Sequence, residues 1–221
     1  MRKVVASTFL SLDGVMQAPG GPDEDPTGGF KHGGWTVNYW DEMMGAALDN
    51  VFGEPFDLLL GRKTYEIFAA HWPYIGEDHP IGKRFNSVTK YVATSSTEPL
   101  NWQNSVALKG GAAVAVKTLK QGDGPMLLLQ GSGDLIQTLL SSDLIDEFTL
   151  WTFPLVLGRG KRLFGKGAMP VALKLTDSKV STTGVTISSY VRDGEIVTGS
   201  FALEPPTSAE LERREKMERE E

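Results

Sequence analysis

The feature that most constrains the fold is the stretch of residues 57–66, which reads DLLLGRKTYE. Its first part is a short apolar run of strand length, and the residues after it place Tyr65, Phe68 and Ala69 at helical spacing. A fully buried strand that runs directly into a helix is half of a β–α–β unit. The stretch therefore predicts a parallel sheet, with a glycine turn between the strand and the helix.

The same alternation of strands and helices recurs along the chain. We predict strands over residues 3–10, 57–60, 90–94, 105–108, 125–130 and 147–153, and helices over 40–51, 61–71, 112–120 and 134–140. This order predicts an α/β fold, with a mostly parallel sheet and helices on both of its faces. From residue 171 the pattern changes to strands alone. Asp193-Gly194, between the stretches 185–191 and 196–203, is a strong hairpin signal, so the sheet is expected to finish antiparallel.

Composition narrows the class of protein further. At 221 residues the chain can form one large domain, which we place at residues 1–204, followed by a charged, solvated tail at 205–221. A net charge of −6 disfavours a general nucleic-acid binder. The absence of cysteine excludes thiolate metal sites, and the three histidines lack metal-ligand spacing, so we expect no metal. No stretch is long enough to span a bilayer, and we expect a cytoplasmic protein without membrane contacts.

Four strand ends carry residues suited to a ligand site. In an open parallel sheet, ligands lie outside the carboxyl ends of the strands. Those ends hold Asp13, residues 61–64, residues 94–96 and residues 131–133. Asp13 could anchor or protonate a substrate, although a turn residue that hydrogen-bonds its own backbone is nearly as good an interpretation.

Two of these turns offer phosphate chemistry. Gly61 allows close approach to the backbone, Arg62 and Lys63 supply charge, and Thr64 supplies a hydroxyl at a helix start. Ser95 and Ser96 could hydrogen-bond a second phosphate, and the small residues Gly131, Ser132 and Gly133 open a helix, which suits a pyrophosphate. Two separate phosphate sites on one sheet suggest a dinucleotide. The alternative is a glycine turn with two solvated cations.

At this point the residues carry a resemblance to a known superfamily. Residues 58–66 look like the strand-plus-helix signature of dihydrofolate reductases. The rest resembles the reductase domain of bacterial riboflavin biosynthesis (the RibD C-terminal domain) more closely, through SLDG at 11–14, QGSG at 130–133 and PLVLGRG at 154–160. The GGW motif at 33–35 is similar to stand-alone bacterial members. The likeness spans about residues 3–203.

The resemblance implies a three-layer α/β/α fold with about eight strands and an NADPH-dependent reductase. Residues 61–64 would bind the cofactor phosphates, and Thr94, Ser95 and Ser96 would lie near its 2′-phosphate. Gly131, Ser132, Gly133 and Leu135 would line its pyrophosphate and nicotinamide side. Asp13 would face the substrate pocket, and the segment from Trp35 to Met44 would close it. The resulting candidates for substrate contact are Asp13, Trp35, Trp40 and Asp41.

Departures from the family pattern leave the substrate open. Val15 stands where the riboflavin reductases usually place lysine, and the folate enzyme's acid has only Asp41 and Glu42 as possible counterparts. The favoured hypothesis is hydride transfer from NADPH to a small pterin-like or aminopyrimidine-like heterocycle, with burial raising the pKa of Asp13. The alternative is a non-catalytic nucleotide-binding or pterin-binding protein of the same fold.

We also expect a homodimer. Residues 148–153, FTLWTF, are apolar on both faces of a strand and could meet a second copy near the sheet edge. The resembled reductases are often dimers as well.

Overall fold

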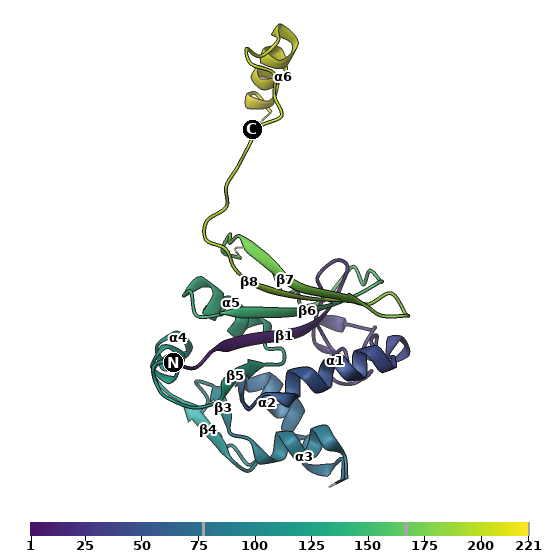
Figure 1. Ribbon diagram of the computed structural model, residues 1–221, viewed down its shortest axis with the longest axis vertical. Coiled ribbons are helices and arrows are strands. Elements are labelled where there is room, and N and C mark those ends of the chain that lie inside the picture. The colour runs from purple at the N-terminus through teal and green to yellow at the C-terminus, as the bar shows by residue number, and fades with distance from the viewer. Residues whose placement is uncertain (77, 166–167, 221) are drawn as a thin grey trace.

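The computed structural model describes residues 1–76, 78–165 and 168–220. Its centre is an eight-stranded sheet in the order β4-β3-β2-β5-β1-β6-β8-β7 (Figure 1). The strands are β1 (Val4–Ser11), β2 (Phe56–Gly61), β3 (Lys90–Ala93), β4 (Ser105–Leu108), β5 (Met126–Leu129), β6 (Glu147–Phe153), β7 (Leu173–Val180) and β8 (Thr186–Arg192). The α-helices are α1 (Glu42–Gly53), α2 (Arg62–Ala69), α3 (Pro80–Ser87), α4 (Ala112–Gln121), α5 (Gly133–Ser141) and α6 (Ser208–Glu218).

The strands from β4 to β6 in this order run parallel. Strand β2 pairs with β3 and β5, and β1 pairs with β5 and β6. The leucine run of β2 suits its interior place, because Leu58, Leu59 and Leu60 are each 0% exposed. Successive side chains of a strand point to opposite faces, so such a run requires cover on both sides. The predicted α/β fold with a mostly parallel sheet is confirmed.

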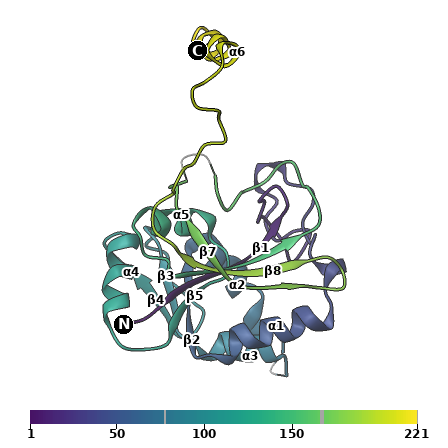
Figure 2. The same cartoon turned by 45° about the horizontal axis from the view of Figure 1, so that its top comes forward.

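Helices supply that cover and complete the three layers. On one face, Leu58 belongs to an apolar cluster with Tyr65 of α2 and Phe85 of α3. Helix α1 lies beside α3 on this face (Figure 2). On the other face, Leu59 clusters with Val116 of α4 and with the apolar side of α5. The expected three-layer α/β/α arrangement is therefore confirmed.

The sheet finishes antiparallel, as expected, but the predicted hairpin is in the wrong place. Strands β7 and β8 form the hairpin, and the turn over residues 181–185 is closed by the Ser181 hydroxyl, which accepts the Val185 N–H at 2.9 Å. Asp193-Gly194 follows this hairpin, and residues 196–203 form no strand in the described chain. The prediction failed because β8 already pairs with β6 on one side and β7 on the other.

The apolar stretch 148–153 does not lie at a sheet edge. It belongs to β6, which pairs with β1 and β8, and Phe148, Trp151 and Phe153 are 0–2% exposed. The expectation that this stretch meets a second copy near the edge is therefore wrong. The edges of the described sheet are β4 and β7.

Helix α3 was not predicted. It begins with Pro80, and the His79 ring accepts the Gly82 N–H at 3.3 Å as its N-cap. Histidine is not among the usual capping residues, so the sequence gives no clear start signal.

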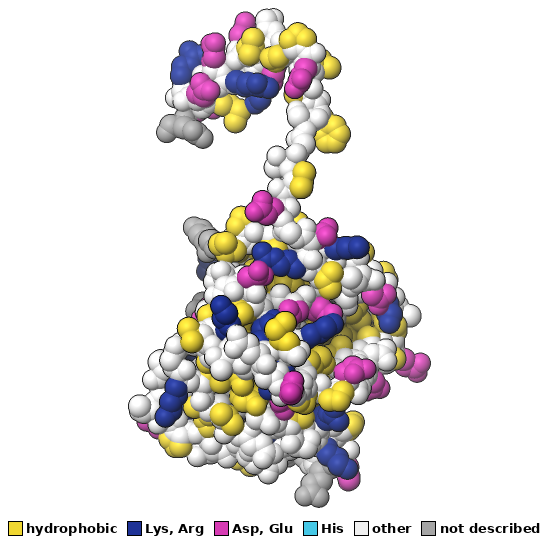
Figure 3. All heavy atoms as spheres, turned by 60° about the vertical axis from the view of Figure 1, so that its left-hand side comes forward, with side chains coloured by type: hydrophobic (Ala, Val, Ile, Leu, Met, Phe, Trp, Pro, Cys, Tyr) yellow, Lys and Arg dark blue, Asp and Glu magenta, His cyan; other side chains and the backbone are white. Residues whose placement is uncertain are grey.

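The C-terminal segment leaves the body of the protein. Residues 193–207 run without helix or strand to α6, which stands apart from the domain and buries none of its residues (Figures 1 and 3). The Thr207 hydroxyl accepts the Glu210 N–H at 3.3 Å as the N-cap of α6. None of the helices in the described residues has the length and apolarity needed to cross a membrane.

Candidate functional site

A cavity of about 860 Å³ lies along the carboxyl edge of the parallel strands. It is lined by the ends of β2, β3 and β5, by Ser7, Thr8 and Phe9 of β1, and by parts of the long loop that follows β1. Parallel strands bring their carboxyl ends to one edge of a sheet, so turns that are far apart in sequence meet here. Arg62, Ser95 and Ser132 all line this one cavity.

Most predicted cofactor residues lie together in this cavity. Those that line it are Gly61, Arg62, Lys63, Thr64, Thr94, Ser95, Gly131, Ser132, Gly133 and Leu135. Ser96 is exposed and is not among the lining residues. Its hydroxyl accepts the Glu98 N–H at 3.1 Å, and its own N–H donates to the Thr94 hydroxyl at 3.0 Å. Ser96 therefore shapes the loop after β3.

One hydroxyl joins the two principal turns. The Ser132 Oγ accepts the Gly61 N–H at 2.8 Å and donates to the Thr64 hydroxyl at 2.7 Å. A Cβ at Gly61 would lie 3.1 Å from this oxygen and 3.2 Å from the Ser132 Cβ, so the close approach requires glycine there. Ser132 itself has a left-handed backbone, with φ at +67°, which directs the turn into α5.

Three helix N-termini open into the cavity. In the described structure, α2, α4 and α5 have N-caps (Gly61, Gly111 and Ser132) that make no side-chain hydrogen bond to the first turn. The first N–H groups of a helix have no partner within the helix and carry its positive dipole end, so they bind anions well. Gly110 and Gly111 line the cavity too, although we did not predict them as site residues. A glycine pair between a strand and a helix at this edge was the available signal.

The two cations of the first turn differ in their surroundings. The Arg62 Nε pairs with Glu66 at 2.6 Å, and its Nη1 donates to the Glu98 carbonyl at 2.9 Å. The Lys63 side chain is exposed at the rim of the same cavity. No hydrogen bond or ion pair within residues 1–76, 78–165 and 168–220 involves the Lys63 ammonium, so Lys63 can turn toward an anion, whereas Arg62 is already held in place.

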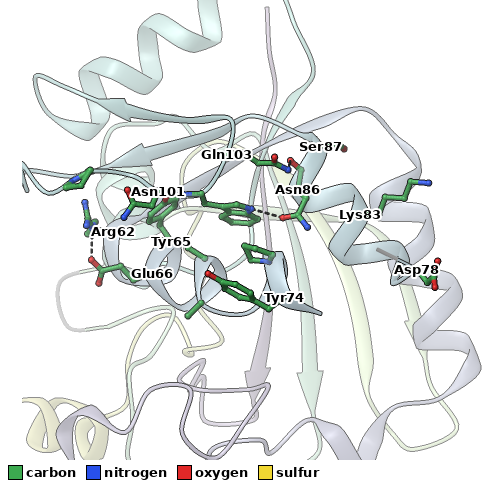
Figure 4. Close-up of a pocket in the computed structure, with 15 residues that line it drawn as sticks. Arg62, Tyr65, Glu66, Tyr74, Asp78, Lys83, Asn86, Ser87, Asn101 and Gln103 are labelled. Carbon is green, nitrogen blue, oxygen red and sulfur yellow. Dashed lines mark hydrogen bonds and ion pairs between the residues drawn. The ribbon is translucent and has the colours of Figure 1, made fainter. Parts of the chain in front are cut away.

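Arg62 also borders a second, more polar hollow of about 950 Å³ on the other side of α2 (Figure 4). There the Trp102 Nε1 donates to the Asn86 Oδ1 at 2.7 Å, and Gln103 donates to the Asn86 carbonyl at 3.1 Å. These bonds tie the segment after β3 to α3. The polar groups of the hollow that form them thus hold the fold together.

Asp13 does not line the cavity. Its carboxylate accepts the Ser11 hydroxyl at 2.6 Å, the N–H groups of Leu157 and Gly158 at 3.0 and 2.9 Å, and the Arg162 Nη2 at 3.0 Å. The Ser11 hydroxyl and then these other donors outweigh burial and hold the pKa of Asp13 well below its usual range. The expectation that burial raises this pKa is wrong. Asp13 fastens the loop after β6 to the end of β1.

The other predicted substrate residues stand behind the cavity wall. The Trp35 Nε1 donates to the Gln17 carbonyl at 2.8 Å. The Trp40 ring packs edge-to-face against the Phe9 ring, with 6.0 Å between the ring centroids. Gln17 and Phe9 line the cavity, whereas the two tryptophans do not. Asp41 caps α1 by accepting the Met44 N–H at 2.8 Å and also accepts the Thr182 hydroxyl at 2.7 Å. These residues support the wall.

Sequence reasoning missed a carboxyl group inside the cavity. Glu24, in the long loop, lines it, and its Oε2 accepts the Gly20 N–H at 2.6 Å. Burial raises the pKa of Glu24, and no ion pair involves it among the residues that the structure describes. Asp25 beside it pairs with Lys161, which with the Thr27 hydroxyl lowers the pKa of Asp25 although burial would raise it. Two neighbouring acids with pKa values displaced in opposite directions are typical of acid–base sites.

The cavity also has an apolar wall. Its members are Phe9, Leu48, Ile67, Phe68 and Trp72, and Met16 lines the cavity from the other face of the sheet. An apolar pocket with a few convergent polar groups is the usual form of a small-molecule site.

Comparison with known proteins gives a family. The profile described as the RibD C-terminal domain matches residues 2–187. Two proteins of Bacillus subtilis (strain 168) are similar over almost their whole length, and both are uncharacterized. YwjB is 27% identical, and the match covers 86% of this chain and 98% of YwjB. YyaP is 24% identical, and the match covers 87% of this chain and 96% of YyaP.

Solved structures agree on the fold. A protein from Shewanella sp. PV-4, provisionally named a riboflavin biosynthesis protein, superposes with a TM-score of 0.59 at 24% identity, over 86% of this chain and 99% of that one. A pyrimidine reductase-like protein from Corynebacterium diphtheriae superposes with a TM-score of 0.57 at 13% identity, over 88% of this chain and 93% of that one. Dihydrofolate reductase from Enterococcus faecalis, complexed with NADP(H), superposes with a TM-score of 0.55 at 12% identity, over 86% of this chain and 96% of that one. These superpositions show the dihydrofolate reductase-like fold. The profile match shows that the chain belongs to the RibD C-terminal domain family.

Proposed function

We propose that the protein is an NADPH-dependent reductase that delivers a hydride to a small pterin-like or aminopyrimidine-like heterocycle. Membership of the RibD C-terminal domain family supports a reductase. The observation that carries the proposal is the convergence in one cavity of three helix N-termini, an apolar wall and the Glu24 carboxyl, which forms no ion pair among the described residues.

The lining residues fit a pyridine dinucleotide. The N–H groups at the starts of α2 and α5 suit its phosphates, and Gly61 and Gly131 leave the backbone accessible. Lys63 and Ser95 also line the cavity, and they can hold a further phosphate group by charge and hydrogen bonding. When bound, the cofactor would supply the hydride.

At the ring to be reduced, the chain's own contribution is alignment and a proton. The wall that includes Phe68 and Trp72 positions a flat ring and excludes water. Glu24, whose pKa is raised by burial, keeps its proton to higher pH than an exposed glutamate and can donate it to the reduced ring. Asp13 lies outside the cavity, so we assign the proton to Glu24.

The test is cofactor discrimination. Trp72 lines the cavity, so intrinsic tryptophan fluorescence should be quenched on titration with NADPH and less steeply with NADH. Lys63→Ala should weaken NADPH binding by about 1.5–3 kcal/mol, the range for a hydrogen bond to a charged group, and should change NADH binding little. Lys117→Ala, on the exposed side of α4, is the matched control and should bind NADPH as the parent does.

Turnover is then followed as NADPH oxidation in the presence of a panel of pterins and aminopyrimidines. Oxidation dependent on one member of the panel supports the reductase. Tight NADPH binding with no oxidation by any member would favour the non-catalytic alternative. If neither nucleotide binds saturably, the proposed function fails at its first step.

A further inference from the structure

An unusually apolar segment lies in solvent after the last strand. We call residues 193–207 the C-terminal arm. Its large apolar side chains are exposed: Ile196 is 55% exposed, Val197 93%, Phe201 110% and Leu203 72%. Figure 3 shows hydrophobic side chains along this stretch with open space around them. Isolated exposed apolar residues are common, but a run of them in one extended segment marks an interaction site.

The arm has the pattern of a half-buried strand. Side chains of a strand alternate between its two faces, so Val197, Gly199, Phe201 and Leu203 would share one face. Ile196, Thr198, Ser200 and Ala202 would lie on the other face, where Ile196 is the one large apolar side chain. The sequence predicts a strand over residues 196–203. The structure provides the segment with no neighbouring strand in the described chain.

Strand β7 offers the matching surface. Among the described residues it pairs with β8 alone, so its outer N–H and C=O groups are open. Leu175 and Val180 are 52% and 66% exposed. A β-bulge between Leu175 and Asp177 shifts the register of β7 by one residue. Leu175 and Val180 therefore share one face, opposite Tyr190 and Thr186 of β8. An open edge with an apolar face is a template for another strand.

The arm of the same chain is badly placed for this edge. The Asp193 N–H donates to the Ala172 carbonyl at 2.9 Å, and the Ala172 N–H donates to the Gly194 carbonyl at 3.4 Å. The arm therefore starts on the inner side of the segment that enters β7, and it then runs away from the sheet (Figure 1). To reach the outer edge of its own β7, it would have to cross over that entering segment.

We propose that residues 196–203 of each chain add as a strand to the outer edge of β7 in a second copy, in a reciprocal exchange that makes a two-fold symmetric dimer. The amphipathic arm would then continue the amphipathic β7, with Phe201 and Val197 beside Leu175 and Val180. A two-fold interface of this kind uses the same pair of elements twice, so each contact occurs two times. This relocates the expected dimer contact from the interior strand β6 to the edge strand.

The first test measures mass in solution. The full chain should elute with a light-scattering mass near twice 24.1 kDa, and Val197→Asp/Phe201→Asp should shift it toward 24.1 kDa at the same concentration. Met217→Asp in α6 is the control, because Met217 is also exposed (56%) but lies outside the proposed strand, and it should leave the mass unchanged. A monomeric parent, or a dimer that persists in the double variant, would overturn the proposal.

The second test does not depend on the folding of a disruptive variant. The chain has no cysteine, so single cysteines can be introduced by Gly199→Cys, on the Val197 and Phe201 face of the arm, and by Ser178→Cys, on the Leu175 and Val180 face of β7. After the two proteins are mixed and oxidised, mass spectrometry should find the disulfide-linked peptide pair from residues 199 and 178. Val106→Cys on β4, the opposite edge, replaces Ser178→Cys in the control mixture and should give no such pair.

A chain that carries both Gly199→Cys and Ser178→Cys separates the two possible partners. Disulfide-linked dimers on a denaturing gel support exchange between copies. A disulfide within each monomer would show that the arm folds onto its own β7, and equal cross-linking to Val106→Cys would show an indiscriminate arm. Either of these results contradicts the proposal.

Discussion

At the scale of single residues, Ser132 has the most consequences for the site. Its hydroxyl satisfies the Gly61 N–H and bonds to Thr64, so it links the end of β2 to the end of β5. These bonds join positions 71 and 68 residues apart in the chain. The sequence showed Ser132 as a small residue between two glycines. Its partners became apparent only when the sheet placed β5 beside β2.

Ser132→Ala should therefore destabilise the protein and weaken cofactor binding together. Loss of the hydroxyl leaves a partly buried N–H without its acceptor, which costs about 1–3 kcal/mol. Urea denaturation measures the change. Ser142→Ala, at the exposed C-cap of α5, is the matched control and should change stability by less than about 0.5 kcal/mol. Equal stability of the two variants would mean that the hydroxyl does not hold the two turns together.

Glu24→Gln tests the proposed proton donor. Turnover should fall by at least about 100-fold, the lower range for general acid catalysis, while NADPH binding is retained. In the parent, turnover should decline as pH rises through the raised pKa of Glu24, because the protonated form is the donor. The variant should lose this limb of the pH profile. Asp134→Asn, an exposed carboxyl at the same cavity, is the control and should keep the limb.

Glu24 should also leave a signature in stability. Because its folded pKa is raised, the folded state binds the proton more tightly than the unfolded state does. That contribution is full below the ordinary value of 4.5 and is lost as pH rises through the raised value. The parent should therefore lose stability relative to Glu24→Gln across this window. A difference that is flat with pH would argue against the shift.

Asp13 predicts the opposite pH dependence. Its folded pKa is depressed, so its contribution is present above the ordinary value of 3.8 and is lost as pH falls below that value. Asp13→Asn should cost about 1.5–3 kcal/mol near neutral pH, because hydrogen bonds to a charged group are replaced by weaker ones. The difference in unfolding free energy between the parent and Asp13→Asn should become smaller as the solution is acidified. Asp143→Asn removes an exposed pair with Arg192 and should cost less than about 1 kcal/mol in the same urea titrations.

At the scale of elements, the close approach of β2 and β5 depends on Gly61. Gly61→Ala would place a methyl group 3.1 Å from the Ser132 Oγ and should destabilise by about 1–3 kcal/mol, as overpacking does. Gly45→Ala in α1 has nothing within 4 Å and should instead stabilise by about 0.5–1 kcal/mol. Thermal unfolding of the two variants should therefore shift in opposite directions. Two shifts of the same sign would contradict the packing argument.

The elements that the sequence predicted well are those whose own residues define them. The leucines of β2 are buried on both sides, so their run identified an interior parallel strand. The end of the sheet was harder, because a hairpin signal at Asp193-Gly194 is local and cannot show that β8 already has two neighbours. Helix α3 was missed because its cap is a histidine.

The site divides in the same way. Glycines and cations at strand ends were found, because the parallel order alone brings them to one edge. Asp13 sits at such an end as well, but the loop after β6 reaches it from 144 residues away and occupies its carboxylate. Glu24 was missed because the long loop has no periodicity that could show which of its acids turns inward.

At the scale of the whole molecule, arm exchange predicts that stability depends on concentration. A folded dimer is favoured by mass action, so the midpoint of thermal unfolding should rise as the protein is concentrated. Phe201→Asp should remove this dependence, and Met217→Asp should keep it. Differential scanning calorimetry over a wide concentration range measures the effect. A midpoint that is constant in the parent would mean that folding and assembly are not coupled.

The hydroxyl bridge between Gly61 and Thr64 has one more consequence. Because it fixes the starts of α2 and α5 relative to each other, the spacing between their anion-binding ends is set before any ligand arrives. A nucleotide whose phosphates match this spacing then binds to a preorganised site, and little of its binding free energy is lost to ordering the protein. Nucleotides that are shorter or longer by one phosphate should bind poorly for a geometric reason, even where their total charge is favourable.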